Sequence, residues 1–311
     1  MLTNFLEKSK PINFIVYLGL FFCFLFFTLF SNIFSNQFTW NLLLESSFFV
    51  LLFLIIFFFY NFIVSKNKLT FDHSYAFFLF ATILIPLINN VLKQETLIIL
   101  IVYLLFLRKI YSLRSSNKVI QKTFDGGFWL AILFILEPNT ILFVVLLFAA
   151  ILLQQKGNIH TLLSPIIGFV APLFIYFSYL FWKDSTESFT KLFEINISNN
   201  LTNSNFTPIT YLLIAIFTLS LISFFMKSPR ALSVNNSFKK SWILLIINLV
   251  IGLIFLIINP IENGVGYAIL LVPTSIIIAN GFEVIQSKII KNVIVGILLI
   301  SIFFTFISTT I

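Results

Sequence analysis

The chain has 311 residues, of which 59% are hydrophobic and only 10% charged, and its mean hydropathy is +1.07. Because so little polar surface cannot cover a water-soluble globule, the composition excludes a soluble domain. It predicts an all-α, polytopic integral membrane helix bundle. The net charge is +8, and the single cysteine, Cys23, has no partner for an internal disulfide. No Cys or His pair has metal-ligand spacing, so we expect no metal and no other cofactor.

Apolar runs divide the chain into about 11 candidate spans, because a helix needs roughly 20 mostly apolar residues to cross a bilayer. The first run follows Lys8 and Lys10 and is not followed by a small-residue cleavage site, so we interpret it as a retained helix and not a signal peptide. The predicted spans are 12–30, 47–64, 74–92, 95–107, 124–136, 141–153, 162–182, 208–226, 241–258, 265–282 and 292–310.

Basic residues predict the orientation of these spans, since short cytoplasmic loops carry an excess of Lys and Arg. With the N-terminus inside and the C-terminus outside, only Lys93, Lys183 and Lys191 lie outside, and the other 16 of the 19 basic residues lie inside. The positive charge is therefore interpreted as a topology signal that favours anionic lipids of the inner leaflet, with no nucleic-acid partner. The longest basic inside loop, 108–122, is either an ordinary inside loop or a site for an anionic lipid head group or a partner.

We expect residues 1–311 to form a single transmembrane domain in a bacterial inner membrane, with membrane lipids as partners. The sequence identifies no protein partner and no oligomeric state.

Polar residues interrupt the apolar run 124–153, where Glu137, Pro138, Asn139 and Thr140 follow one another. One straight helix of that length would measure about 45 Å, whereas the hydrocarbon core is roughly 30 Å thick. Proline removes a backbone donor and disfavours helix at the preceding residue, so the sequence predicts a break at Glu137. A pair of short full spans and a re-entrant hairpin both fit the charge pattern. In the re-entrant case, residues 137–140, with Glu137 and Asn139 among them, line the floor of a cavity open to the outside.

The longest predicted outer segment, 183–207, contains a short amphipathic pattern. Asp184 and Glu187 have the spacing of a capping box, and Phe189, Leu192 and Phe193 share one helical face. The pattern predicts a short helix at the membrane interface, which either gates a lipid substrate or tethers the loop.

Two further acids lie beside predicted outer ends of spans: Glu45 at the end of the first outer loop and Glu262 at the mouth of the tenth span. Such acids serve as a general base or ligand site, or are ordinary interfacial residues. His73 and His160 lie at predicted inner ends without a nearby Ser, Cys or acid at triad spacing, so we interpret both as interfacial histidines.

Three stretches resemble helices of the polytopic C-type glycosyltransferases. These are FDGGFWLAILFILEPNTILFVVLLFAAILL (124–153), GFVAPLFIYFSYLFW (168–182) and GVGYAILLVPTSIIIANGF (264–282). The stretch KPINFI (10–15) is also similar to the start of a group of uncharacterised bacterial envelope membrane proteins. The glycosyltransferase resemblance implies a polyprenyl-phosphate-linked sugar as donor and an acid in the first outer loop, here Glu45, as the base that activates the acceptor.

Three hypotheses follow. The first is a membrane glycosyltransferase with an outward-facing cavity and Glu45 as catalytic residue. Its predicted substrate-binding residues are Glu137, Asn139, Lys183, Lys191 and Glu262, of which a lysine meets the lipid phosphate. The second is a non-enzymatic scaffold or assembly protein of the envelope. The third, a transporter or flippase, is the least favoured because charges are scarce deep in the spans.

Overall fold

The computed structural model describes residues 5–35, 39–194, 207–233, 236–259 and 264–310, and the elements within them are helical. In chain order they are α2 (Pro11–Ser35), α3 (Trp40–Lys66), α4 (Tyr75–Leu84), η1 (Ile85–Leu87), α5 (Ile88–Val91), α6 (Gln94–Ser112), α7 (Val119–Leu136), η2 (Pro138–Phe143), α8 (Val144–Leu153), α9 (Ile159–Trp182), α10 (Glu187–Lys191), α11 (Pro208–Ser233), α12 (Asn236–Ile258), α13 (Val265–Val284) and α14 (Lys288–Thr310). The prediction of an all-α protein is confirmed for the described residues.

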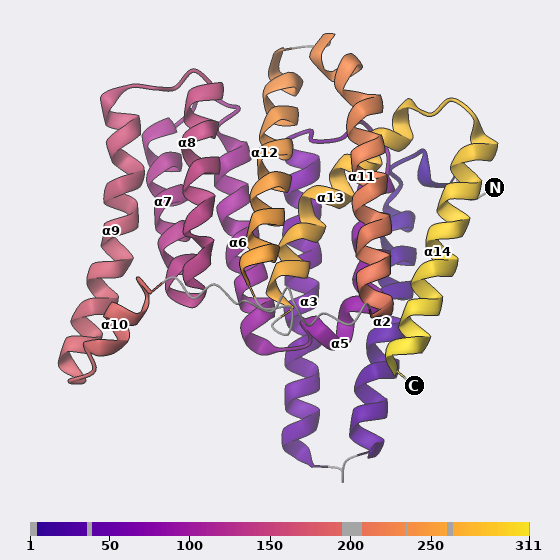
Figure 1. Ribbon diagram of the computed structural model, residues 1–311, viewed down its shortest axis with the longest axis horizontal. Coiled ribbons are helices and arrows are strands. Elements are labelled where there is room, and N and C mark those ends of the chain that lie inside the picture. Colours follow the sequence, from indigo (N-terminus) through magenta and orange to yellow (C-terminus); the bar gives the residue numbers. More distant parts are fainter. Residues whose placement is uncertain (1–4, 36–38, 195–206, 234–235, 260–263, 311) are drawn as a thin grey trace.

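The long helices run alongside one another as a bundle, with their connections gathered at two ends (Figure 1). Eight of the described helices are long and apolar enough to cross a membrane, and two shorter apolar stretches cover Tyr75–Val91 and Pro138–Leu153. The helix α6 is not among those eight, and its charged residues Glu95, Arg108 and Lys109 lie near its two ends, which leaves a shorter apolar stretch between them. The chain is therefore a multi-pass helical membrane protein, and its predicted count of 11 spans stays a prediction.

The two ends of the bundle differ in the connections they carry (Figure 1). We name one the basic end; it carries the connections 67–74, 113–118, 154–158 and 285–287. The opposite end carries the turn between α7 and η2, the connection from α5 to α6, and α10. The connections predicted to lie inside the cell thus share one end of the molecule, although the side of the membrane on which that end lies stays a prediction.

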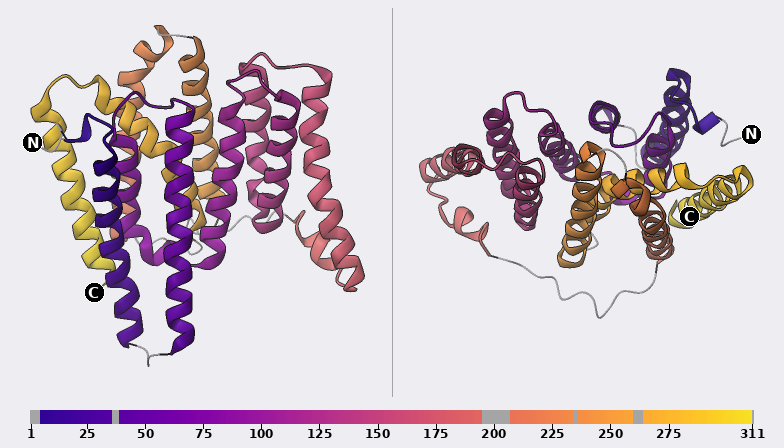
Figure 2. Two further views of the ribbon diagram at one scale, coloured as in Figure 1. Left: turned by 180° about the vertical axis from the view of Figure 1, so that it is seen from behind. Right: turned by 90° about the horizontal axis from the view of Figure 1, so that it is seen from above.

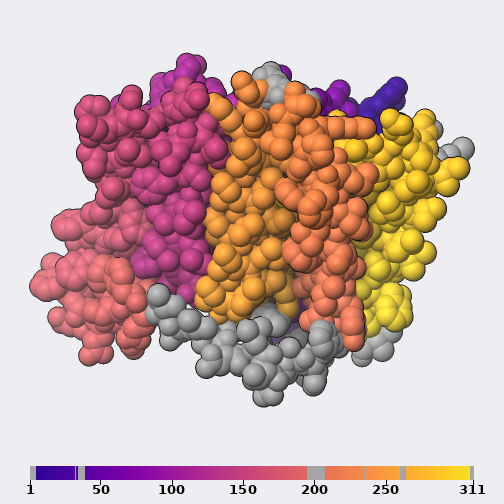
Figure 3. All heavy atoms as spheres, turned by 45° about the horizontal axis from the view of Figure 1, so that its top comes forward, coloured from indigo at the N-terminus to yellow at the C-terminus, as the bar shows by residue number. Residues whose placement is uncertain are grey.

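The helix α13 lies at the centre of the bundle, surrounded by α4, α6, α11 and α12 (Figure 2). Its residues from Val265 to Phe282 are buried. A helix that is apolar on every face is stable only when it is covered all round. The surrounding helices contribute the outer surface, and α12, α11 and α14 lie side by side on the face shown in Figure 3.

The helices α7 and α9 pack closely because glycines remove side chains from their contact. A Cβ atom at Gly127 would lie 2.0 Å from the carbonyl oxygen of Pro165, and one at Gly168 would lie 2.2 Å from that of Phe124. Small residues let membrane helices approach in this way, and the resulting van der Waals contact drives their association. On its other faces α9 exposes large apolar side chains, among them Phe174 and Trp182, as expected of a helix that faces lipid.

Candidate functional site

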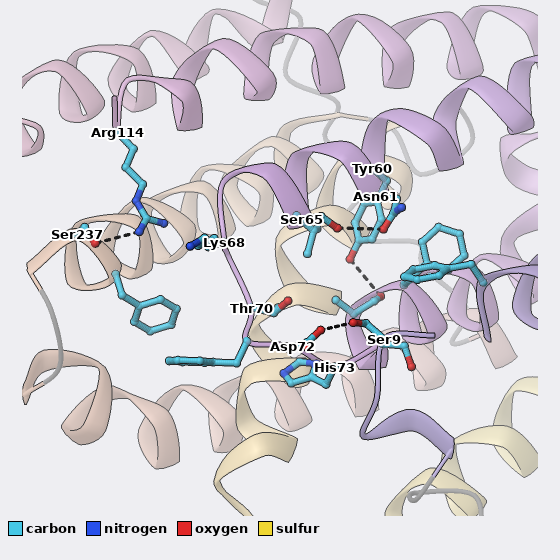
Figure 4. Close-up of a pocket in the computed structure, with 17 residues that line it drawn as sticks. Ser9, Tyr60, Asn61, Ser65, Lys68, Thr70, Asp72, His73, Arg114 and Ser237 are labelled. Carbon is cyan, nitrogen blue, oxygen red and sulfur yellow. Dashed lines mark hydrogen bonds between the residues drawn. The ribbon is translucent and has the colours of Figure 1, made fainter. Parts of the chain in front are cut away.

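A polar cavity of about 570 Å³ lies at the basic end, between α2, α3 and the connection 67–74 that joins α3 to α4 (Figure 4). Side chains from the connection after α6 and from the start of α12 complete its wall. The lining residues are Ser9, Phe14, Tyr60, Asn61, Val64, Ser65, Lys68, Thr70, Phe71, Asp72, His73, Ser74, Ala76, Phe77, Arg114, Ser237 and Phe238.

The end of α3 directs Lys68 into this cavity. The backbone of α3 closes with a hydrogen bond from Leu69 N to Val64 O (3.1 Å) and one from Lys68 N to Ser65 O (3.3 Å). This pattern is the Schellman motif, in which the residue after the cap adopts a left-handed conformation that glycine favours. Here that residue is a lysine with φ of 50°. Within the part of the chain that the structure describes, its ammonium group has no hydrogen-bond or ion-pair partner.

Arg114 supplies a second cation, which two hydrogen bonds hold in place. Its Nη1 donates to the carbonyl oxygen of Asn67 (2.7 Å), and its Nη2 donates to Oγ of Ser237 (3.0 Å). The guanidinium thus joins the end of α3 to the start of α12 and keeps further N–H groups for a ligand, since arginine has five donors. Arg114 and Lys68 lie on the same side of the cavity in Figure 4.

A carboxylate and a hydroxyl group lie on another side of the cavity (Figure 4). Ser9 donates its hydroxyl proton to Asp72, and Tyr17 and Ser74 share a hydrogen bond of 3.0 Å close by. The wall therefore carries two cations and one carboxylate, with neutral hydroxyl and amide groups between them. Such a lining suits a ligand that bears both a negative group and hydroxyl groups.

Buried charges hold the connection 67–74 against the helices behind it. Lys227 of α11 is buried, and its Nζ lies 2.8 Å from a carboxylate oxygen of Glu283 of α13. The same ammonium group faces the rings of Phe71 (4.8 Å) and Phe238 (5.4 Å), both of which line the cavity. This cluster joins three helices to the cavity wall.

His73 belongs to the same cluster. Its side chain is only 6% exposed, and its Nε2 lies 3.8 Å from the carboxylate of Glu283, beyond hydrogen-bond distance. Among the described residues neither ring nitrogen has a hydrogen-bond partner. Buried polar atoms are almost always hydrogen-bonded, so an imidazole in a cavity wall that lacks a hydrogen bond is a candidate contact for a ligand group.

The sequence did not identify this site. Lys68 and Arg114 look like ordinary basic residues of inside loops, and 108–122 was singled out only as one possible head-group site. His73 was interpreted as an interfacial histidine because its acidic neighbour, Glu283, is 210 residues away in the chain. The only local signal was a lysine at the end of α3, in a position where a glycine is usual.

The break predicted in the run 124–153 is where the structure places it. The helix α7 ends at Leu136, Glu137 has extended backbone angles (φ −146°, ψ 100°), and Pro138 begins η2. The turn closes by its own contacts, because Thr140 donates through both its N–H (3.0 Å) and its hydroxyl group (2.7 Å) to the carbonyl oxygen of Glu137. Asn139 donates to the side-chain oxygen of Asn259, just after α12. Glu137 and Asn139 are half-buried and Thr140 is buried.

The other predicted site residues lie on separate elements of the opposite end. Glu45 lies within α3, which begins at Trp40, and not in a loop as expected; its side chain is exposed. Lys183 caps the end of α9 and lies over the ring of Tyr179 (4.6 Å), and Lys191 ends α10. Glu262 lies outside the described residues. The described members of this set do not line the polar cavity.

The short helix predicted in 183–207 is present as α10, but its expected capping box is wrong. The cap residue is Thr186, which makes no side-chain capping hydrogen bond, and Asp184 lies before it with φ of 52°. The predicted aromatic face is used for packing: Phe189 contacts Phe177 of α9 and Phe193 contacts Phe134 of α7, with ring centroids 5.1 and 5.5 Å apart. The helix is therefore docked on the bundle.

Helices long enough to cross a membrane, a fully covered central helix and a polar cavity at one end define a multi-pass α-helical membrane protein. The chain belongs to a family of unknown function (DUF6427), whose model matches residues 1–311. No curated protein and no solved structure matches it.

Proposed function

We propose that this protein binds an anionic, phosphate-bearing group in the polar cavity at the basic end. The observation that carries the proposal is the ammonium group of Lys68, which has no partner among the described residues, in one cavity with the anchored guanidinium of Arg114. Arginine and lysine are the usual partners of phosphate oxygens, and hydrogen bonds between charged groups are about twice as strong as neutral ones. The buried imidazole of His73 adds a third nitrogen group.

The predicted orientation places this cavity on the cytoplasmic side of the membrane. In this proposal residues 1–311 form one transmembrane domain of 11 spans in a bacterial inner membrane, with membrane lipids around it. A binding role is favoured over a purely structural scaffold, because a buried imidazole that has no hydrogen bond among the described residues adds nothing to helix packing.

The test is equilibrium dialysis of radiolabelled glycerol 3-phosphate against the full-length protein in a neutral detergent. We expect saturable binding that weakens as salt screens the charges. Lys68→Gln keeps the length and polarity of the side chain but removes its charge. Losing a charge-assisted hydrogen bond costs about 1.5–3 kcal/mol, so the affinity should fall by about tenfold or more.

The matched control is Lys66→Gln, because Lys66 is an exposed basic residue two positions earlier that does not line the cavity. The control should bind as the unchanged protein does. Equal losses in the two variants would assign the binding to general surface charge and overturn the proposal, as would the absence of saturable binding in the unchanged protein.

The glycosyltransferase hypothesis is a second proposal, which rests on the resemblance of three helices and not on the cavity. Its site residues, Glu45, Glu137, Asn139, Lys183, Lys191 and Glu262, belong to the opposite end in that hypothesis. It predicts that Glu45→Gln abolishes transfer from a polyprenyl-phosphate-linked sugar while the protein level is unchanged. Product formation at the original rate would rule it out.

A further inference from the structure

The cavity has an apolar part as well as its charged groups. Its cations, Lys68 and Arg114, belong to connections at the end of the bundle, whereas Phe14, Val64 and Phe77 belong to helices and form an apolar part. Tyr60, Asn61 and Ser65 of α3 add polar groups beside it. The rings of Phe14 and Phe77 meet edge to face with centroids 5.0 Å apart. A small soluble anion would use only the polar part, so the apolar part calls for a ligand with an apolar portion.

The cavity extends along α3 into the apolar length of the helix. Asn61 lines it and lies five residues before the end of α3 at Lys66, which corresponds to about 7–8 Å along the axis at 1.5 Å per residue. That depth matches the distance from head groups to the start of the acyl chains, where amphipathic elements insert by about 5–10 Å. The cations of the cavity thus lie at the end of the bundle, and its lining reaches about as deep as the start of the acyl chains of a membrane lipid.

The rings of α2 and α3 contact each other on the side of the cavity that is farther from the basic end. Phe21 of α2 contacts Phe53 and Phe57 of α3, with ring centroids 5.0 and 4.9 Å apart. Nearer the basic end, Phe14 of α2 and Asn61 of α3 instead line the cavity, and both are half-buried. Both helices are candidate membrane spans with large apolar side chains exposed, so we expect lipid to contact the outer faces of α2 and α3 at this level.

We infer that the phosphate-bearing ligand is a lipid, with its phosphate at Lys68 and Arg114 and the start of its chain between α2 and α3 beside Phe14 and Phe77. This inference rests on the proposed function, and the shared chemistry, a phosphate group, could also come from a soluble phosphate ester. The two sources differ in whether anything occupies the apolar part of the cavity.

The experiment uses the full-length protein in nanodiscs of phosphatidylcholine with a small share of phosphatidic acid that carries a diazirine group near the start of its acyl chain. After illumination, peptides are mapped by mass spectrometry. We expect label at Phe14, Asn61 and Phe77, and its loss in Lys68→Gln. A phosphatidylcholine with the same diazirine should label the lipid-facing surface without preference for these residues.

A variant distinguishes binding of the acyl chain of the lipid from binding of its phosphate group. Val64→Phe enlarges an apolar side chain in the apolar part of the cavity, so it should lower lipid labelling severalfold while leaving the binding of glycerol 3-phosphate unchanged. The matched control is Leu54→Phe, which places the same ring on the exposed face of α3 and should leave both measurements unchanged.

The outcomes are distinct. Binding of glycerol 3-phosphate without preferential lipid labelling would overturn the lipid inference and leave the proposed function standing. Failure of both would overturn both. Labelling that persists in Lys68→Gln would show that the acyl chain binds without the phosphate contact, and would also overturn the inference.

Discussion

Two polar segments of this apolar chain, residues 137–140 and 67–74, lie at opposite ends of the bundle. They differ in whether their polar side chains have hydrogen-bond partners. The turn at 137–140 interrupts a long apolar run, yet its groups find partners in the protein: Thr140 bonds back to Glu137, and Asn139 reaches Asn259. The connection 67–74 looks unremarkable in sequence, yet among the described residues the ammonium group of Lys68 and the imidazole of His73 have no hydrogen-bond partner and line a cavity. A conspicuous polar motif can therefore be a way to fold the chain back, and an ordinary loop can hold the ligand site.

The largest effect is expected from thiol labelling on a Cys23→Ser background, which compares the segments 137–140 and 67–74 directly. Asn139→Cys and Lys68→Cys place one thiol at each end. With a membrane-impermeant reagent we expect Asn139→Cys to react in intact cells and Lys68→Cys to react only after permeabilisation, because the two connections belong to opposite ends of the bundle. An exposed cysteine at Lys183 is the positive control from the opposite end. Labelling of Lys68→Cys in intact cells would reverse the predicted orientation.

The next largest effect concerns the packing of α7, the helix that leads to the turn at 137–140, against α9. Gly127→Val would bring a side chain against the backbone of Pro165, which no rotamer change relieves. Overpacking costs typically 1–3 kcal/mol and more against rigid backbone, so we expect a loss of about 3 kcal/mol or more. The midpoint of thermal unfolding in detergent should fall by at least about 5 °C.

Gly296→Val is the matched control for that substitution, because a Cβ at Gly296 meets nothing within 4 Å. It should cost less than about 1 kcal/mol, the difference in helix propensity being small. Equal shifts in the two variants would mean that α7 and α9 do not pack as closely as described.

A smaller effect is expected at the turn itself. Asn139→Ala removes the hydrogen bond to Asn259. The loss of one such bond costs about 1 kcal/mol, so the unfolding midpoint should fall slightly while glycerol 3-phosphate binding is unchanged. Weaker binding in this variant would mean that the turn at 137–140 influences the cavity at the basic end. The two segments would then not be independent, as the comparison assumes.

The smallest expected change in stability is a gain and not a loss. Lys68→Gly relieves a left-handed conformation that costs a non-glycine residue about 1–2 kcal/mol, part of which is offset by the greater freedom of glycine in the unfolded chain. We expect a gain of about 0.5–1 kcal/mol in stability together with loss of glycerol 3-phosphate binding. A variant that is less stable and still binds would show that Lys68 has a structural role and not a binding role.

The candidate site was only partly accessible to sequence reasoning. The basic loops could be recognised, since charge at span ends is a local property, but Lys68 and Arg114 could not be separated from the other basic residues. What distinguishes them is contact with residues far away in the chain, as when Arg114 binds Ser237. The hypothesis built on Glu45, Glu137 and Lys191 selected residues by their position in loops, and the structure distributes these residues over α3, the α7–η2 turn and α10.

By itself the sequence determined the class of protein, the all-helical architecture and the break at Glu137, because hydrophobic length, proline geometry and composition act within one stretch of chain. Only the tertiary structure decided that α13 is the covered central helix, that Asn139 pairs with Asn259 and that Lys68, Arg114 and His73 surround one cavity. Those outcomes depend on which helices pack together. In a membrane that choice rests on close contact between small residues and on single polar contacts, which hydrophobicity alone does not encode.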